Sequence, residues 1–229
     1  MQVKYPVVIL TYDRQEFLSK VLVEHSRVNT PKPILIFDDG SKDISSLIAL
    51  EKNSDYVVFP MRHLHYRNQF SEIGRILGKL GYKYFVFTED DASFAINWYQ
   101  YGMKVLEKLD AEYEVGALSF YSGHSKPNGK KVLPNVYKHI DDHFYGTCGI
   151  VVNTKYIEQI KTTMFTRDGC SNPDVSMRQM SIDKQFNLFV VFPNIVQHEG
   201  VGKSLVKAPQ HHSDTFIGNN KDALKELSL

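Results

Sequence analysis

The chain has 229 residues, of which 42% are hydrophobic, and its 27 Lys and Arg against 26 Asp and Glu leave a formal net charge of +1. This composition is ordinary for a globular protein with one substantial core. The near-neutral charge excludes a bulk attraction to nucleic acid or membranes, although a local basic patch stays possible. No apolar run approaches the ~20 residues that span a bilayer, and residues 1–6 lack the apolar core of a signal peptide. Cys148 and Cys170 have no metal-like spacing, which is typical of free thiols in a reducing compartment. We therefore expect a soluble, cytoplasmic protein.

The first half of the chain alternates apolar runs with segments of helical periodicity. Apolar runs that do not alternate with polar residues predict strands buried on both faces. The predicted order is strand 6–12, helix 15–25, strand 34–37, a helix to about residue 50, strand 56–59, helix 71–80 and strand 84–88. This alternation with short connections is typical of a parallel sheet with helices on both faces. The sequence therefore predicts a single-domain α/β fold with a mostly parallel central sheet.

Three consecutive carboxylates, Glu89, Asp90 and Asp91, follow strand 84–88. Adjacent carboxylates repel one another unless a cation or N–H donors compensate their charge. The carboxyl end of a buried parallel strand is also where open α/β sheets bind ligands. The alternative is an acidic first turn of a helix that starts near Ala95.

The strand at 34–37 also ends in acid, with Asp38 and Asp39 before Gly40. Their oxygens could accept hydrogen bonds from a ligand, and the alternative is an Asx-type turn before Gly40. Two strands that end in acid at one edge of a sheet favour a ligand site.

The second half has a less regular pattern. The predicted order is helix 97–109 with a buried aromatic face, strand 115–120, a long loop 121–135, a strand that ends at 153, short helix 156–161, turn 169–173, helix 175–186, a last strand 188–193 and a polar, mobile tail beyond 209.

Four segments carry a family resemblance, in chain order. Thr-Tyr-Asp-Arg at 11–14 resembles a Thr-Tyr-Asn-Arg turn, and Asp-Asp-Gly-Ser-Lys-Asp at 38–43 resembles an Asp-Asp-Gly-Ser-Thr-Asp loop that holds base and ribose. Glu-Asp-Asp at 89–91 resembles a metal-binding Asp-x-Asp motif, and Gln-His-x-Gly-x-Gly at 197–202 resembles a late His loop that meets diphosphate and metal. Together they resemble the glycosyltransferase A-type fold, chiefly the family 2 and N-acetylglucosaminyltransferase I-like enzymes, over about residues 5–205.

The resemblance implies a Rossmann-like sheet and a metal-dependent transfer from a nucleoside-diphosphate sugar, with a UDP-sugar favoured. It divides the chain into a nucleotide-sugar-binding half at 1–121, an acceptor-binding and catalytic half at 122–208, and a tail at 209–229. The implied nucleotide-sugar ligands are Thr11, Tyr12, Arg14, Asp38, Asp39, Glu89, Asp90 and Lys203, and the implied metal ligands are Asp91 and His198.

The chemistry agrees with the implied cofactor, Mn²⁺ or Mg²⁺. A departing nucleoside diphosphate needs its charge neutralised, and a hard divalent cation with oxygen ligands does this. A His ligand such as His198 favours Mn²⁺ over Mg²⁺, and the alternative is a surface His in a Gly-rich loop. Gly200, Gly202 and Lys203 could bring N–H groups and an ammonium to phosphate.

The resembled families invert the sugar by direct displacement, which needs one general base. The matching position is Asp174, before the helix predicted at 175–186. An N-cap is the alternative role for this Asp, and Asp141, Asp142 and His143 form a rival cluster for the base.

Two other functions stay open. A sugar nucleotidyltransferase has the same fold, but that class usually opens with a Gly-rich loop, and residues 12–15 contain no glycine. A non-catalytic carbohydrate-binding protein would have no need for the acidic triplet and His198.

The acceptor is unknown, and the sequence indicates no membrane or lipid partner. The segment at 123–138 could meet an anionic acceptor such as a hydroxymethylated base in DNA, and its alternative role is a solvated loop. Its basic and flanking aromatic residues are Tyr121, His124, Lys126, Lys130, Lys131, Tyr137 and Lys138.

Overall fold

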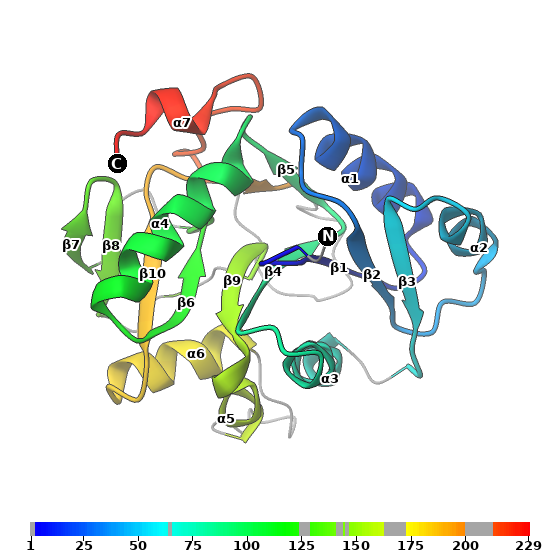
Figure 1. Cartoon of the computed structure of the whole chain (residues 1–229), viewed down its shortest axis with the longest axis horizontal. Helices are drawn as coiled ribbons and strands as arrows, with labels where there is room; N and C mark the ends of the chain where they lie inside the picture. The colour runs from blue at the N-terminus through cyan, green and yellow to red at the C-terminus, as the bar shows by residue number, and fades with distance from the viewer. Residues whose placement is uncertain are drawn as a thin grey trace.

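A computed structural model describes residues 3–63, 66–123, 129–140, 144, 147–162, 173–199 and 213–229. These residues form a nine-stranded sheet with helices on both faces, and a separate two-stranded sheet (Figure 1). The helices are α1 Gln15–Arg27, α2 Ser45–Glu51, α3 Tyr66–Lys79, α4 Trp98–Glu112, the 3₁₀ turn η1 Thr154–Tyr156, α5 Ile157–Thr162, α6 Pro173–Ile182 and α7 Ala223–Glu226. None of the described helices is long and apolar enough to cross a membrane.

The large sheet has the strand order β3-β2-β1-β4-β9-β6-β10-β8-β7. Its strands are β1 Val7–Thr11, β2 Ile34–Asp38, β3 Tyr56–Pro60, β4 Tyr84–Glu89, β6 Val115–Ser119, β7 Gly129–Leu133, β8 Val136–His139, β9 Gly149–Asn153 and β10 Asn187–Val191. The small sheet pairs β5 Ala92–Phe94 with β11 Val196–His198. The predicted α/β class is confirmed.

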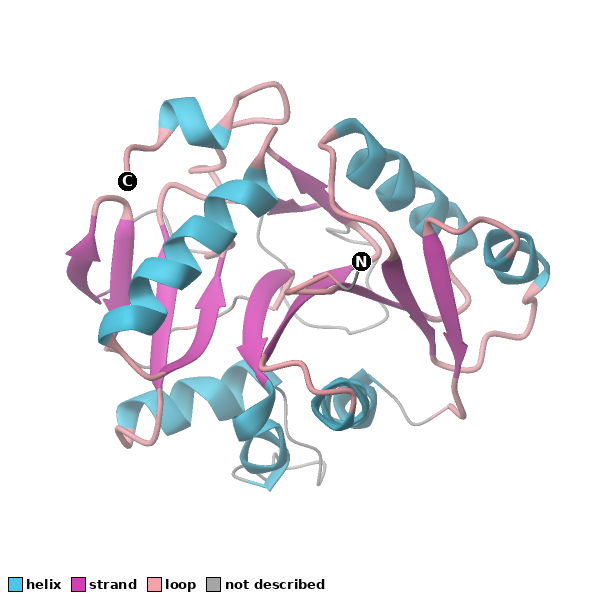
Figure 2. Ribbon diagram, in the orientation of Figure 1, coloured by secondary structure: helices cyan, strands magenta, loops and turns pink. Residues whose placement is uncertain are grey.

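Two apolar layers cover the large sheet. The helices α1 and α4 lie on one face, and α3, α5 and α6 lie on the other (Figure 2). The buried side chains of these two groups of helices belong to two separate apolar clusters. The predicted buried face of α4 is confirmed, because Trp98, Tyr101, Val105 and Leu109 are all fully buried.

The first four strands in the order are parallel, as predicted. In this register Thr11 pairs with Asp38, and Leu10 pairs with Glu89. The acidic ends of β2 and β4 therefore meet at one edge of the sheet, beside the end of β1.

The other half of the sheet is mixed: β10 runs parallel to β6, but the remaining pairs are antiparallel. β9 runs antiparallel to both β4 and β6, and β8 runs antiparallel to β10. The predicted loop 121–135 is wrong at residues 129–133, which form β7 of a hairpin with β8. This edge strand is polar and partly exposed, so it lacks the apolar pattern by which strands are recognised.

The chain after Asp91 is also not a helix. Residues 92–94 form β5, and α4 begins only at Trp98, after Asn97 in the left-handed conformation (φ 58°). The alternative role of the acidic triplet as a helix first turn is therefore wrong.

The C-terminal residues are not the mobile tail that their polarity predicted. Within the described part, 213–229, the bridges Asn194–Phe216 and Ile96–Asp222 attach the backbone to the fold. Leu227 is buried against the core. Ala223 and Leu227 have the i, i+4 spacing of a helix, but the mostly polar residues around them hid this short signal.

Candidate active site

The small sheet brings the late His segment to the acidic triplet. In the β5–β11 pairing His198 lies opposite Ala92, the residue after Asp91. The backbone N–H of Glu199 donates to the carbonyl of Asp91 at 2.8 Å. Residues more than a hundred positions apart are thus fixed side by side by backbone hydrogen bonds.

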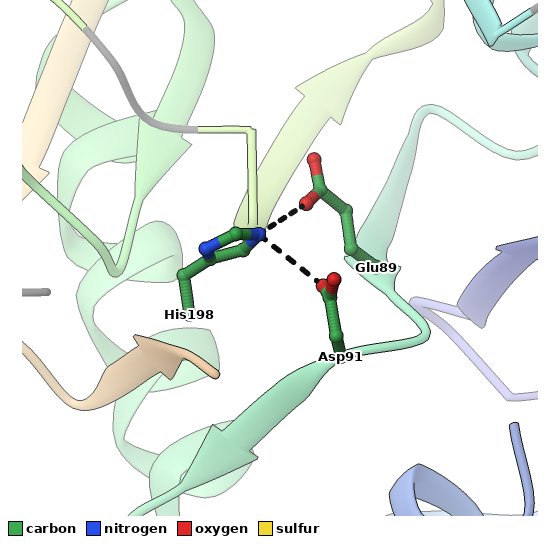
Figure 3. A group of neighbouring side chains, drawn as sticks. All are labelled: Glu89, Asp91 and His198. Atoms are coloured by element: carbon green, nitrogen blue, oxygen red, sulfur yellow. Dashed lines mark ion pairs between the residues drawn. The ribbon is translucent and has the colours of Figure 1, made fainter. Parts of the chain in front are cut away.

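Glu89, Asp91 and His198 point toward one another (Figure 3). The Nε2 atom of His198 lies 3.4 Å from Oε2 of Glu89 and 3.4 Å from Oδ1 of Asp91. Glu89, predicted as a nucleotide-sugar ligand, therefore lies in the group that the sequence assigned to the metal.

This group fits a divalent cation. The Oδ1 atom of Asp91 is buried and has no hydrogen-bond partner among the described residues, and an unsatisfied buried carboxylate oxygen is costly. Two carboxylates and an imidazole are donors that Mn²⁺ accepts, and Mg²⁺ prefers the oxygens.

The protonation of His198 follows from these neighbours. Burial lowers the pKa of His198, but a hydrogen bond to Glu89 and the charges of Glu89 and Asp91 outweigh it, so that the pKa is raised overall. The imidazolium and a bound cation thus compete for the same carboxylate oxygens.

Arg14 neutralises the other side of the triplet. Its Nη1 lies 2.8 Å from Oδ1 of Asp90, and its Nη2 lies 2.7 Å from Oδ2 of Asp91. The hydroxyl of Thr11 donates to Oδ2 of Asp90 at 3.0 Å. Burial raises the pKa of Asp90 to about 7, against the lowering effect of Arg14. Thr11 and Arg14, both predicted nucleotide-sugar ligands, therefore contact the triplet directly.

The Asp38 carboxylate holds its own loop. Its Oδ2 accepts from the backbone N–H of Ser41 at 3.0 Å, and its Oδ1 accepts from the Ser41 hydroxyl. The hydroxyl oxygen of Ser41 accepts from the N–H of Asp13 at 2.8 Å, and the Asp13 carboxylate accepts from the N–H of Lys42 at 2.7 Å. The Asx-type turn is thus present, and it locks the loop after β2 to the loop after β1.

Asp39 is held from the other side by two residues that sequence reasoning missed. Its Oδ1 accepts from the side-chain amide of Gln69, and its Oδ2 lies 3.1 Å from Nδ1 of His63. The His63 ring stacks on Tyr12, with centroids 4.5 Å apart. Nothing in the local sequence marks His63 or Gln69, because only the pairing of β2 with β3 brings them to Asp39.

Asp174 is the second residue of α6 and is buried, with 8% of its surface exposed. Its Oδ1 accepts from the backbone N–H of Val175 at 2.9 Å. Burial raises the pKa of Asp174 to about 6; the Val175 hydrogen bond lowers it, and the negative charge of Glu89 raises it. Asp174 is therefore close enough to the triplet to respond to its charge.

Several predicted residues lie outside the described part of the chain. They are Lys203 with Gly200 and Gly202, the rival base cluster at 141–143, and His124 and Lys126 of the basic segment.

No protein-family model and no curated protein matches the chain. Solved structures do match. TarS from S. aureus in complex with UDP-GlcNAc has a TM-score of 0.54 at 14% identity, over 85% of this chain and 57% of that one. The mannosyltransferase PcManGT from Pyrobaculum calidifontis, in complex with GDP-Man and Mn²⁺, has a TM-score of 0.54 at 14% identity, over 85% of this chain and 55% of that one.

A UDP-glucose pyrophosphorylase in complex with UDP-glucose has a TM-score of 0.52 at 11% identity, over 82% of this chain and 89% of that one. The chain spans 59% of the TarS 1–349 fragment, 36% of the longer TarS structure and 55% of PcManGT. At these identities the likeness concerns the fold alone. The chain is therefore a single-domain α/β protein whose mostly parallel sheet matches those of glycosyltransferases of the A-type fold.

Proposed function

We propose that the protein is a metal-dependent glycosyltransferase that moves a hexosyl or pentosyl group from a nucleoside-diphosphate sugar to a hydroxyl acceptor, with inversion. The observation that carries the proposal is the convergence of Glu89, Asp91 and His198 around Oδ1 of Asp91, a buried oxygen with no hydrogen-bond partner among the residues described. The matched structures that hold UDP-GlcNAc, or GDP-Man with Mn²⁺, support it.

In this proposal Asp91 and His198, with Glu89 beside them, hold Mn²⁺ or Mg²⁺. The bound cation would neutralise the charge that develops on the departing diphosphate. The nucleoside lies over the interlocked loops after β1 and β2, where Tyr12 and Asp39 are the predicted contacts. The hydrogen bonds of Asp38 give it a supporting role in that loop.

Asp174 is the proposed general base. Its carboxylate takes the proton of the acceptor hydroxyl, whose oxygen forms a bond to the anomeric carbon. The bond from that carbon to the β-phosphate oxygen breaks, and its electron pair leaves with the nucleoside diphosphate. A buried carboxylate with a pKa of about 6 is a stronger base than an exposed one and is still ionised at pH 7.

A thermal-shift panel of UDP-, GDP- and CDP-sugars, with and without Mn²⁺, tests the proposal, because a ligand that binds the native state raises its melting temperature. We expect one nucleotide to stabilise the protein only with Mn²⁺, with a preference for UDP. The Asp91→Asn variant should lose this shift, whereas Glu107→Gln, an exposed carboxylate on α4, should keep it. A shift that needs no metal and persists in Asp91→Asn would contradict the proposal.

The pyrophosphorylase match makes a nucleotidyltransferase the second candidate. The turn after β1 disfavours it, because the turn has no glycine and its Arg14 is engaged by Asp90 and Asp91. Release of pyrophosphate from a nucleoside triphosphate and a sugar 1-phosphate would favour it, and a complete lack of nucleotide-stimulated metal binding would favour a non-catalytic protein.

DNA is the anionic acceptor that we propose to test. In the β7–β8 hairpin Lys130 lies opposite Lys138, and Lys131 lies opposite Tyr137. Within the described part of the chain these three lysines make no ion pair, although lysines also protect edge strands from pairing. Affinity for a hydroxymethylated duplex that falls steeply with salt, and falls further in Lys130→Gln/Lys138→Gln, would support a DNA acceptor.

A further inference from the structure

The Arg14 guanidinium connects the loop after β1 to the acidic triplet after β4, which carries two of the three residues of the proposed metal site. It forms one ion pair to Asp90 and one to Asp91, and the side chains of both acids are almost fully buried. The backbone of Arg14 is fixed, because its carbonyl accepts a hydrogen bond from the N–H of Leu18 in the first turn of α1. A rigid planar fork between two adjacent carboxylates sets the orientation of both.

The ion pair with the Arg14 guanidinium makes the two carboxylate oxygens of Asp91 different from each other. Oδ2 is bound by Arg14 at 2.7 Å, whereas Oδ1 is buried, has no hydrogen-bond partner in the part of the chain that the structure describes, and lies 3.4 Å from Nε2 of His198. We infer that Arg14 is a positioning residue that ties down Oδ2 of Asp91 and so presents Oδ1 alone to a divalent cation. This inference rests on the proposed metal site.

A direct contact with the sugar nucleotide is the role that the sequence predicted for Arg14. Two features favour positioning instead. Both terminal nitrogens of Arg14 already bind carboxylates, and the guanidinium lies over the Phe17 ring, 4.1 Å from its centroid, with only 15% of the side chain exposed. Because Asp90, Asp91 and Phe17 hold the guanidinium on three sides, Arg14 acts on the proposed metal site through Asp91.

The two roles differ in one measurable respect. A nucleotide contact leaves the affinity for metal alone unchanged, whereas loss of a positioning partner weakens it. Partners that orient metal ligands typically contribute about 10- to 100-fold to metal affinity. If Arg14 instead acted only as a nearby positive charge, it would repel the cation, and its removal would tighten Mn²⁺ binding.

The test is a titration with Mn²⁺ followed by electron paramagnetic resonance, without nucleotide, on the full chain. We expect Arg14→Gln to weaken Mn²⁺ binding by about 10- to 100-fold, and Arg14→Lys, which keeps the charge but not the fork, to weaken it less. The matched control is Arg75→Gln, because Arg75 pairs with Glu72 on the surface of α3 and should not affect Mn²⁺. Circular dichroism reports whether each variant is folded. If Arg14→Gln does not fold, the Mn²⁺ affinity of Arg14→Lys decides whether Arg14 is a positioning residue.

The outcomes separate this inference from the proposed function. Equal or tighter Mn²⁺ binding by the Arg14 variants, with binding by the wild type intact, overturns the positioning role alone. No Mn²⁺ binding by the wild type, with or without a nucleotide, overturns the metal site and the positioning role together.

Discussion

At the scale of single residues, the partners of a buried carboxylate, and not its burial alone, separate the proposed base from the carboxylates of the acidic triplet. Asp90 and Asp174 are both buried with raised pKa values, but Asp90 is paired with Arg14 and Thr11, whereas Asp174 accepts only a backbone N–H among its described contacts. The ion pair with Arg14 engages the Asp90 carboxylate, whereas Asp174 makes no ion pair within the described residues, so Asp174 is the carboxylate that we propose as the proton acceptor.

The pKa of Asp174 makes activity depend on pH. The base must be deprotonated, so transfer should rise as the pH increases through about 6 and level off above about 7. Asp174→Asn should lower kcat by ~10²- to 10⁴-fold and keep nucleotide-sugar binding. Initial rates from pH 5 to 8, with binding measured in parallel, check both. Near-normal turnover of Asp174→Asn would move the base to the cluster at 141–143.

At the scale of elements, the candidate metal site depends on β11, and contacts with the C-terminal segment hold this strand in place. The side-chain amide of Gln197, the neighbour of His198 in β11, donates to the carbonyl of Ser213 at 3.0 Å and accepts from its N–H at 3.1 Å. Arg27 of α1 donates to the carbonyls of Phe94 and Asn219 at 2.6 and 2.7 Å. The C-terminal segment thus supports both strands of the small sheet.

The Gln197–Ser213 contact can be tested with Gln197→Leu. This variant removes both hydrogen bonds of Gln197 to the buried Ser213 backbone, and the Ser213 N–H loses its Gln197 acceptor, which should lower the free energy of unfolding by about 1–3 kcal/mol and weaken Mn²⁺ binding. Denaturant titrations and Mn²⁺ titrations measure the two effects. Gln100→Leu, which loses one long contact at 3.3 Å on α4, is the control. Unchanged Mn²⁺ affinity in Gln197→Leu would show that β11 holds His198 without this contact.

At the scale of the whole molecule, one apolar layer continues from the large sheet under the small sheet. His25 of α1 is fully buried in this layer, in a tilted contact with Phe94 with ring centroids 4.5 Å apart, and its Nδ1 lies 3.0 Å from the Thr30 hydroxyl. Burial, with a smaller effect of Lys32, lowers the pKa of His25 from 6.5 to about 3. The global stability is therefore linked to the protonation of a core residue.

The sign of this linkage follows from the two states. Between pH 3 and 6.5 the unfolded chain binds a proton at His25 that the folded chain does not bind. Protonation of His25 therefore leaves the free energy of unfolding undiminished above pH 6.5 and lowers it as the pH falls below 6.5. At pH 5 the loss amounts to about 2 kcal/mol. Urea unfolding at pH 7 and pH 5 should show a smaller decrease for His25→Phe than for the wild type. An equal decrease would mean that His25 takes up its proton in the folded state.

The sequence by itself determined the features that depend on local patterns. Uninterrupted apolar runs predicted β1, β2, β3, β4 and β10, and helical spacing predicted the helices between them. Because parallel strands end at a common edge, the acidic ends of β2 and β4 could be placed together without coordinates. The late segment with His198 was assigned to the same site by family resemblance.

Only the tertiary structure decided what depends on contacts between distant segments. The ion pairs of Arg14 join residues 76 and 77 positions apart, and the β5–β11 pairing that delivers His198 consists of two three-residue strands without a periodic signal. The hairpin edge and the docked C-terminal segment were missed because their residues are polar. Local propensity carries no information about such contacts, since their free energy comes from partners that the fold brings together.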